Sequence, residues 1–129
     1  MIVVDASAAV HLALRDALPR LGPHDAVAPS LLWSETTSAI RHLAWRGDLE
    51  QELAERTVRA LAEAPIRREP PSSLSLDALR VAARLGWVRT YDAEYLALAE
   101  RLEVPLLTLD ARLSRTAREL VGLVPPDSI

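Results

Sequence analysis

Residues 104–113 read VPLLTLDARL, an apolar segment that ends at an aspartate. Leu106–Leu109 has the length and hydrophobicity of a buried strand, and Asp110 follows it directly. The residues after Asp110 return to a helical pattern from Ala111 to Leu120. This stretch therefore predicts a strand, an aspartate and a helix in immediate succession.

The first residues of the chain repeat this order. Ile2–Val4 is a short β-branched run that meets Asp5 at once, and the Ala-rich stretch 6–18 has helical character. Pro19, Gly22 and Pro23 are expected to end that helix. Two copies of the same order favour an α/β domain in which helices connect parallel strands.

The rest of the chain extends the alternation. We expect a short strand at 25–28, helices at 31–46, 49–64, 75–85 and 92–102, a polar connection at 66–73, and a last strand at 121–124. No repeat and no linker divides the sequence, so residues 1–129 are expected to form one domain. The predicted architecture is three-layer α/β/α, with a short, mainly parallel sheet flanked by helices.

Composition excludes several classes of protein. The 129 residues are 50% hydrophobic and 26% charged, a composition that predicts a folded globular protein. No apolar run is long enough for a membrane span, so no transmembrane segment is expected. The amino terminus lacks the basic segment of a signal peptide, so the cytoplasm is the expected location. The absence of cysteine excludes disulfides and thiolate metal sites. Every basic side chain other than histidine is arginine, which excludes Schiff-base and P-loop lysine chemistry.

Two aspartates follow the two most strand-like runs. In an open parallel sheet, ligands bind beyond the carboxyl ends of the strands, so Asp5 and Asp110 are expected to face one crevice. An aspartate at such a position is also a good N-cap for the next helix. Sequence alone leaves both roles open for each residue.

Two further acids belong to helices that face the core. Glu35 lies at the edge of an apolar arc in helix 31–46, and Asp92 shares the inward side of its helix with Tyr95. Four carboxylates near one strand end would repel one another unless a divalent cation neutralised them. The three histidines show no metal spacing, so an all-oxygen site for Mg²⁺ or Mn²⁺ is expected.

Other polar side chains are candidates for supporting roles. Ser7 and Thr108, each two residues from an aspartate, are hydroxyls that can hydrogen-bond a ligand carboxylate. Candidates for contacts with phosphate are the arginines that follow Asp110 or end the Glu35 helix, namely Arg41, Arg46, Arg112 and Arg115. These arginines can equally be solvated side chains on helix surfaces.

Three segments, in this order, resemble the PIN-domain ribonucleases and, within them, the VapC toxins of bacterial toxin–antitoxin pairs. They are VVDASAAV (3–10), APSLLWSETTSAIRHLAWRG (28–47) and TYDAEYLALAERLEVPLLTLDARL (90–113). The resemblance covers about residues 1–47 and 85–118. Glu94 is a charge where relatives often carry a small or apolar residue.

The resemblance implies a specific activity and a set of partners. It implies that Asp5, Glu35, Asp92 and Asp110 bind Mg²⁺ or Mn²⁺ and cleave RNA with a metal-activated water, that a small VapB-like antitoxin blocks the site, and that the toxin is a homodimer. The expected function is thus a metal-dependent endoribonuclease acting as a toxin.

Two other functions remain as alternatives. A non-catalytic PIN-like interaction module would use the acids as helix caps. A phosphohydrolase that forms an aspartyl phosphate is opposed by Ser7, where that chemistry needs a second aspartate, and by the lack of any lysine.

Overall fold

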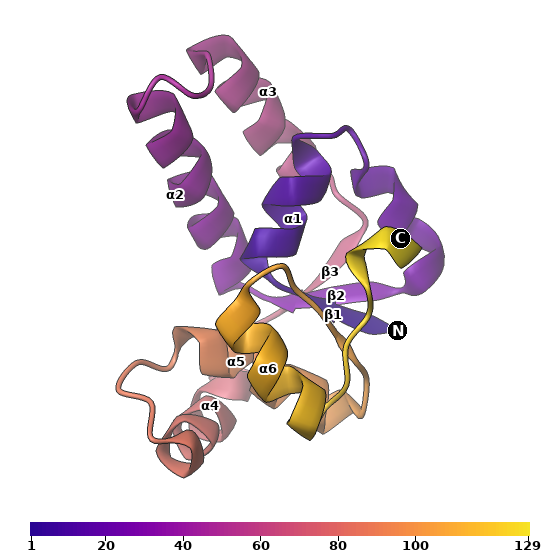
Figure 1. The fold of residues 1–129 in the computed structure, drawn as a ribbon, viewed down its shortest axis with the longest axis vertical. Coiled ribbons are helices and arrows are strands. Elements are labelled where there is room, and N and C mark those ends of the chain that lie inside the picture. Colours follow the sequence, from indigo (N-terminus) through magenta and orange to yellow (C-terminus); the bar gives the residue numbers. More distant parts are fainter.

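The computed structural model describes residues 1–129, in which strands alternate with helices along the chain (Figure 1). The strands are β1 (Ile2–Val4), β2 (Ala26–Pro29), β3 (Ile66–Glu69) and β4 (Leu106–Leu107). The α-helices are α1 (Ala6–Ala13), α2 (Leu31–Trp45), α3 (Gln51–Ala62), α4 (Pro71–Leu85), α5 (Tyr91–Leu102) and α6 (Ala111–Leu120). Two 3₁₀ helices, η1 (Leu18–His24) and η2 (Pro126–Ser128), complete the fold.

The four strands form one parallel sheet in the order β3-β2-β1-β4. Val3 pairs with Val27 of β2 on one side and with Leu106 of β4 on the other. The backbone N–H of Asp5 donates to the carbonyl of Leu107 at 3.1 Å, so β1 and β4 end side by side. The residues that follow these two strands therefore emerge at the same edge of the sheet.

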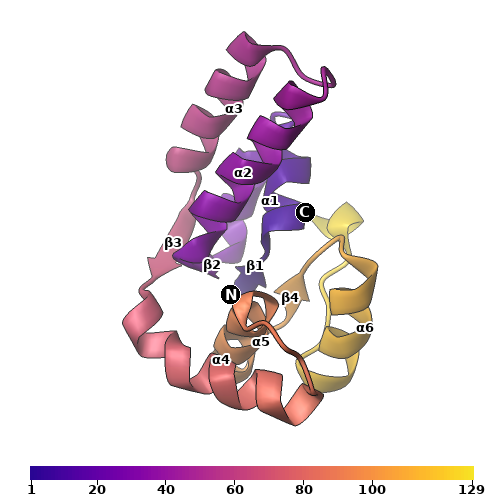
Figure 2. The ribbon, with the colours of Figure 1, turned by 90° about the vertical axis from the view of Figure 1, so that its left-hand side faces the viewer.

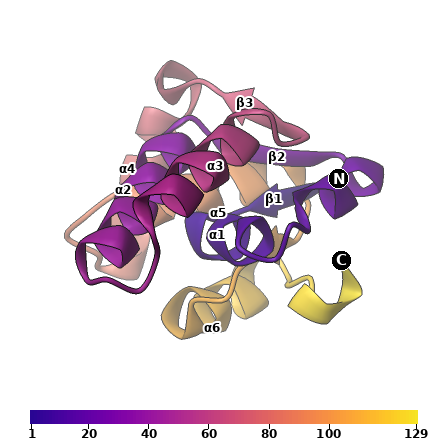
Figure 3. The same cartoon turned by 90° about the horizontal axis from the view of Figure 1, so that it is seen from above.

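Helices cover both faces of the sheet, as the three-layer prediction requires. Helices α1, α2 and α3 lie on one side, and α4 and α5 lie on the other (Figure 2). Seen from above, β1, β2 and β3 lie side by side beneath the first helical layer (Figure 3). Helix α6 packs against α5. The predicted fold class is confirmed by this arrangement.

The core lies between the sheet and its two helical layers. Val3, Val27 and Leu106 are completely buried in the sheet. Five consecutive residues of α5, Tyr95–Ala99, are also buried, because this helix has the sheet on one side and α4 on another. Such burial fixes the position of the whole helix, including its first turn. No helix in residues 1–129 has both the length and the apolar character needed to span a membrane.

The structure corrects the expected boundaries near the amino terminus. Helix α1 ends at Ala13 rather than at residue 18, and Asp16 adopts a left-handed backbone conformation with φ 52°. The segment expected to break the helix instead forms η1, with Pro19 in its first turn. Proline is compatible with a first turn because it has the required φ and no N–H is needed there.

A second correction concerns residues 66–73, which are not a loop. Ile66–Glu69 forms β3, the edge strand, and α4 begins at Pro71 rather than at residue 75. Only Ile66 of this strand is fully buried, so the sequence lacks the apolar alternation that identifies a strand.

Two smaller corrections concern the last strands. β4 is limited to Leu106–Leu107, and the expected strand 121–124 is reduced to a single bridge between Leu123 and Leu106.

Candidate functional site

Asp5 is the innermost of the four predicted acids. It follows β1 and caps α1, because its Oδ1 accepts hydrogen bonds from the Ala8 N–H at 2.9 Å and from the Ser7 hydroxyl at 2.7 Å. The side chain of Thr108 donates to the other oxygen, Oδ2. Asp5 is only 4% exposed, and this burial raises its pKa above the usual 3.8. The charge of Asp110 raises this pKa further, whereas the three hydrogen bonds lower it.

Asp110 occupies the equivalent position after β4. Its Oδ1 accepts a hydrogen bond from the Leu113 N–H at 2.8 Å and caps α6. Unlike Asp5, Asp110 is exposed to solvent. Helix capping and ligand binding are therefore compatible roles for Asp5 and Asp110, since both residues cap helices and both lie at the same edge of the sheet.

Two hydroxyls join the ends of β1 and β4. The Ser7 and Thr108 oxygens are 3.2 Å apart, and both side chains donate to Asp5. Ser7 in turn accepts from the Leu109 N–H at 2.9 Å, and Thr108 accepts from the Asp110 N–H at 3.0 Å. These contacts fix the orientation of the Asp5 carboxylate, and the supporting role of both hydroxyls at a ligand site stays a prediction.

Glu35 reaches the site from α2. Its side chain is half-buried, and the buried Tyr95 hydroxyl of α5 donates to Oε1 at 2.6 Å. Burial raises the pKa of Glu35 above its usual 4.5, and the charges of Asp92, Asp5 and Glu94 raise it further. The Tyr95 hydrogen bond acts in the opposite direction and lowers this pKa. Burial also raises the pKa of Tyr95 itself, so the phenol remains a donor.

Asp92 lies in the first turn of α5 and is half-buried. Its Oδ2 accepts from the Arg112 guanidinium of α6 at 2.6 Å. Glu94, two residues later, is also half-buried, and burial raises its pKa. Because the Glu94 charge acts on Glu35, this fifth carboxylate belongs to the same acidic region.

The acids are neighbours but do not form a preformed metal cage. Mutual repulsion couples Asp5 to Asp110 and couples Glu35 to both Asp5 and Asp92. As the side chains stand, no three acid or histidine side chains are grouped closely enough to bind one metal ion. Tyr95 and Arg112 each hold one carboxylate by a hydrogen bond or ion pair. The donors themselves are carboxylate oxygens, which fit a hard divalent cation.

Two hollows flank Glu35, which lines both of them. The first, here called the Trp87 hollow, is about 560 Å³ and is lined by Glu35, Gly86, Trp87, Val88, Arg89, Tyr91, Asp92 and Arg112. The second, the α1–α2 hollow, is about 660 Å³ and extends from Ser7 along α2 to His42 and Arg46. The acidic region therefore lies at the junction of two surface depressions.

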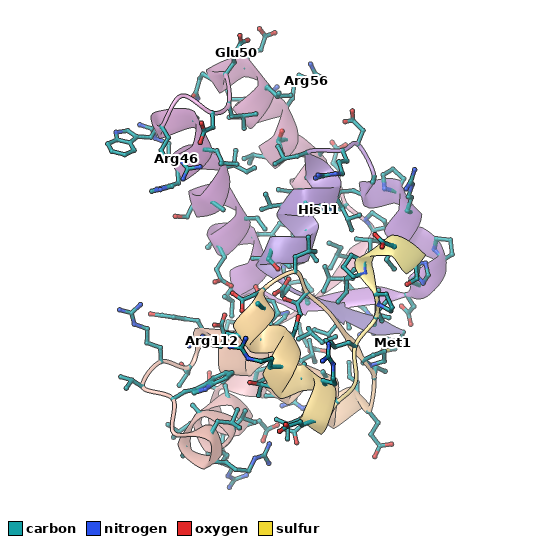
Figure 4. All side chains as sticks on the ribbon, in the orientation of Figure 1. Met1, His11, Arg46, Glu50, Arg56 and Arg112 are labelled. Carbon is teal, nitrogen blue, oxygen red and sulfur yellow. The ribbon has the colours of Figure 1, made fainter.

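The four predicted phosphate-binding arginines are not grouped in one place. Figure 4 shows Arg46 near the far end of α2 and Arg112 on α6, in a different part of the molecule; each lines one of the two hollows. Arg41 instead lines a separate depression between α2 and α3, and Arg115 is exposed on α6. Sequence reasoning missed Arg89, which lines the Trp87 hollow; its position between a helix-ending glycine and Asp92 was the available signal.

A parallel sheet with acids after its strands defines a class of α/β proteins with a ligand site at the carboxyl edge. Within this class, a family model described as the PIN domain matches residues 2–119, which include all four predicted acids. The PIN domain is a nuclease fold. The chain belongs to the PIN-domain family, in the group of the VapC ribonucleases, as the sequence predicted.

The relatives and a solved structure agree with this assignment. Ribonuclease VapC9 of Mycobacterium tuberculosis is 37% identical over 120 residues, 92% of each chain. Ribonuclease VapC3 of the same organism is 34% identical over 123 residues, 88% of this chain and 85% of the relative. The crystal structure of PAE2754 from Pyrobaculum aerophilum superposes with a TM-score of 0.78 and 25% identity, covering 98% of this chain and 84% of that one.

Proposed function

We propose that this chain is a divalent-metal-dependent endoribonuclease and the toxin of a toxin–antitoxin pair. The observation that carries the proposal is that Asp5 and Asp110 follow the neighbouring strands β1 and β4, while Glu35 is electrostatically coupled to Asp5 and Asp92. The names of the relatives, all ribonucleases, support RNA as the substrate. Residues 1–129 act as one PIN domain in this proposal.

The proposed cofactor is Mg²⁺ or Mn²⁺, bound by the four acids. Burial is the main cause of the raised pKa values of Asp5 and Glu35. The donor set contains only oxygen, and neither carboxylate pairs with a basic side chain that would supply a neutralising charge. A divalent cation supplies that charge, and when bound it supplies Lewis-acid chemistry toward water and phosphate. Asp92 and Glu35 each contact Arg112 or Tyr95 through one oxygen, so Oδ1 of Asp92 and Oε2 of Glu35 would be available to a cation.

The chain's own side chains then have distinct tasks. Ser7 and Thr108 hold the Asp5 carboxylate in one orientation. Glu35 is held by Tyr95, and burial together with the neighbouring acids raises its pKa. In this proposal Glu35 completes the site or orients the attacking water.

RNA and a protein partner are the proposed macromolecular ligands. Arg46 and Arg112 lie in the hollows on either side of Glu35 and are the best placed of the four arginines to contact phosphates. Arg41 and Arg115 would serve more distant phosphates. A small VapB-like antitoxin would cover the acidic region with a basic side chain. We also propose that the toxin is a homodimer and acts in the cytoplasm.

A thermal unfolding experiment tests the metal site, and mapping of cut ends tests the nuclease. At a hundredfold excess over the dissociation constant, a cation that binds only the folded protein adds about 2.7 kcal/mol. We expect Mn²⁺ to raise the Tm of the wild type but not that of the Asp5→Asn/Asp92→Asn double variant. Purified protein with Mn²⁺ should also cut single-stranded RNA and leave 5′-phosphate ends, which sequencing of the products detects.

These two measurements separate the nuclease from a non-catalytic module. A module whose acids serve only as caps predicts no Tm shift with Mn²⁺ and no new RNA ends. An equal Tm shift in the wild type and the double variant would place the metal elsewhere. Either result would contradict the proposed function.

A further inference from the structure

The Trp87 hollow has a composition that the four acids do not account for. Besides Glu35 and Asp92, it is lined by two aromatic rings, those of Trp87 and Tyr91, and by two arginines. The two acids and two arginines balance in formal charge, so the walls have no net charge without a metal. A volume of about 560 Å³ lies in the usual range of small-molecule pockets, roughly 300 to 1,000 Å³.

The backbone places both aromatic side chains at the hollow, with Trp87 half-buried against the core and Tyr91 exposed. Helix α4 ends at Gly86, whose φ of 72° lies in the left-handed region that favours glycine, and the Trp87 N–H returns to the Ala82 carbonyl at 2.8 Å. The chain then crosses to α5, so Trp87 lies at the start and Tyr91 at the end of the short segment that connects the two helices. Tyr91 is 60% exposed, and Val88 at the rim is 99% exposed.

The arginines lie beside these rings. Arg112 has its guanidinium carbon 5.0 Å from the centroid of the Trp87 ring, in a cation–π contact, while it also pairs with Asp92. The Arg112 side chain is 60% exposed, so its ion pair is screened by water and weak. Arg89 is exposed on the same wall and has no acidic partner within the chain.

We propose that the Trp87 hollow is a subsite for one nucleotide of single-stranded RNA, adjacent to the phosphate that is cut. The base packs against the rings of Trp87 and Tyr91, and its phosphate lies against Arg89 and Arg112. The inference rests on the proposed nuclease function, since Glu35 and Asp92 form one side of the same hollow. The substrate must be unpaired here, because a base inside a duplex cannot stack on a side chain.

Arg112 can change partners as RNA binds. Arg112 would be available to a phosphate once Asp92 served as a ligand of the proposed cation, because its present ion pair is exposed and weak. The Trp87 ring keeps Arg112 near the hollow during this exchange.

Binding of a short fluorescein-labelled single-stranded RNA, measured in EDTA at low salt, tests the subsite without cleavage. We expect Trp87→Ala to weaken binding by about ten- to hundredfold, the usual loss for one stacked base. Trp87→Phe should keep most of the affinity. Tyr91→Ala should weaken binding less, and Arg89→Gln should reduce the slope of log affinity against log salt by about one phosphate contact.

Matched controls use the same substitutions far from the hollow. Trp45→Ala changes an indole that is 70% exposed at the end of α2, and Arg56→Gln changes an exposed guanidinium on α3, labelled at the far end of the molecule in Figure 4. Both should bind RNA as the wild type does. In the wild type, RNA should quench tryptophan fluorescence, and Trp87→Phe should abolish that quenching whereas Trp45→Phe should not.

Several outcomes would overturn the subsite. They are wild-type binding by both Trp87→Ala and Tyr91→Ala, equal affinity for the same RNA annealed to its complement, or no binding of single-stranded RNA by the wild type. Cleavage measured separately with Mn²⁺ distinguishes the two proposals. If Asp5 is needed for cleavage but Trp87→Ala binds RNA with wild-type affinity, only the subsite is contradicted. Trp87-dependent binding without any cleavage would remove the nuclease, and the hollow would remain only as a binding site for single-stranded RNA.

Discussion

At the scale of single residues, the same carboxylate serves structure and site. Asp5 uses Oδ1 to cap α1 and accepts a hydrogen bond from Thr108 at Oδ2. Its burial destabilises the ionised carboxylate and so raises its pKa. A capping aspartate would be equally effective on the surface, where it loses less hydration. The burial of Asp5 together with its coupling to Asp110 and Glu35 is therefore better explained by a ligand than by capping alone.

Replacing Asp92 by Asn should separate the site from the fold. The variant loses an ion pair between partly exposed side chains, so the free energy of unfolding without metal should change by less than about 1 kcal/mol. It should also lose the Mn²⁺-induced rise in Tm and cut RNA orders of magnitude more slowly, because the metal loses a charged ligand. Thermal unfolding and RNA cleavage assays measure these effects.

Asp77→Asn is the matched control for this change. Asp77 pairs with Arg101 at 2.7 Å, and its side chain is 41% exposed against 35% for Asp92, but it lies on α4 outside the acidic region. The control should keep both the Mn²⁺ response and RNA cleavage. Wild-type cleavage by Asp92→Asn, or equal inactivity of Asp77→Asn, would show that the assignment of Asp92 is wrong.

The hydrogen bond between Tyr95 and Glu35 should contribute stability only while Glu35 is ionised. Tyr95→Phe removes a donor that lowers the pKa of Glu35, so this pKa should rise further. Near neutral pH the variant should lose about 1 kcal/mol of the free energy of unfolding, and the loss should shrink in mild acid, where Glu35 becomes protonated. Urea titrations at the two pH values measure the difference.

Tyr91→Phe provides the comparison, because the Tyr91 hydroxyl makes no hydrogen bond within residues 1–129 and its ring is exposed. Its stability should match the wild type at both pH values. A loss in Tyr95→Phe that is the same at both values would mean that the hydroxyl stabilises the core independently of Glu35.

The residues of the candidate site were more predictable than their contacts. Asp5 and Asp110 stand out because each follows an apolar run, and Glu35 and Asp92 stand out by helical periodicity. Contacts across long separations leave no such signal. Tyr95 reaches Glu35 over 60 positions, and Arg112 reaches Asp92 over 20, so only the packing of α5 against its neighbours reveals these pairs.

At the scale of elements, the strongly periodic helices and the buried strands were predicted, and the irregular elements were not. Helices α2, α5 and α6 lie within one residue of their expected bounds. β3 was missed because the edge of the sheet needs backbone pairing but little apolar surface, and its sequence after Ile66 is Arg-Arg-Glu. η1 was missed because Pro19 and Gly22 are as compatible with a 3₁₀ turn as with a loop.

The cap of α6 allows the two roles of Asp110 to be measured separately. Asp110→Ala removes the acceptor for the Leu113 N–H and should lower the free energy of unfolding by about 1 kcal/mol. Asp110→Asn keeps an acceptor oxygen and should remain close to the wild type in stability. Both variants should lose the Mn²⁺ response. Urea unfolding in EDTA and thermal unfolding with Mn²⁺ give the two readouts.

Two results would revise this interpretation of Asp110. If the Ala and Asn variants are equally stable in EDTA, the side chain does not contribute to helix stability as a cap. If Asp110→Asn keeps the full Mn²⁺ response, the charge of Asp110 is not needed for metal binding, and the residue is a cap alone.

At the scale of the whole molecule, the acidic region makes the stability of the protein depend on pH. Burial raises the pKa values of Asp5 and Glu35 above the values of 3.8 and 4.5 that apply in the unfolded chain. In the pH interval between the unfolded and folded pKa values, the folded state binds more protons than the unfolded state. The free energy of unfolding must therefore fall as the pH rises through this interval, and the stabilisation from both groups is fully present only below it.

The metal-free wild type should accordingly lose stability, relative to an Asp5→Asn/Glu35→Gln variant, as the pH increases from about 4 toward neutrality. Excess Mn²⁺ should reverse the trend in the wild type, because the cation competes with protons for the same carboxylates and its stabilising effect grows as they ionise. Urea titrations across this range, in EDTA and in Mn²⁺, measure both effects. If the stability difference between wild type and variant in EDTA is constant with pH, the two acids are not destabilised by burial. If the trend also stays the same with Mn²⁺, the charges that the fold gathers at this edge of the sheet are not neutralised by a cation.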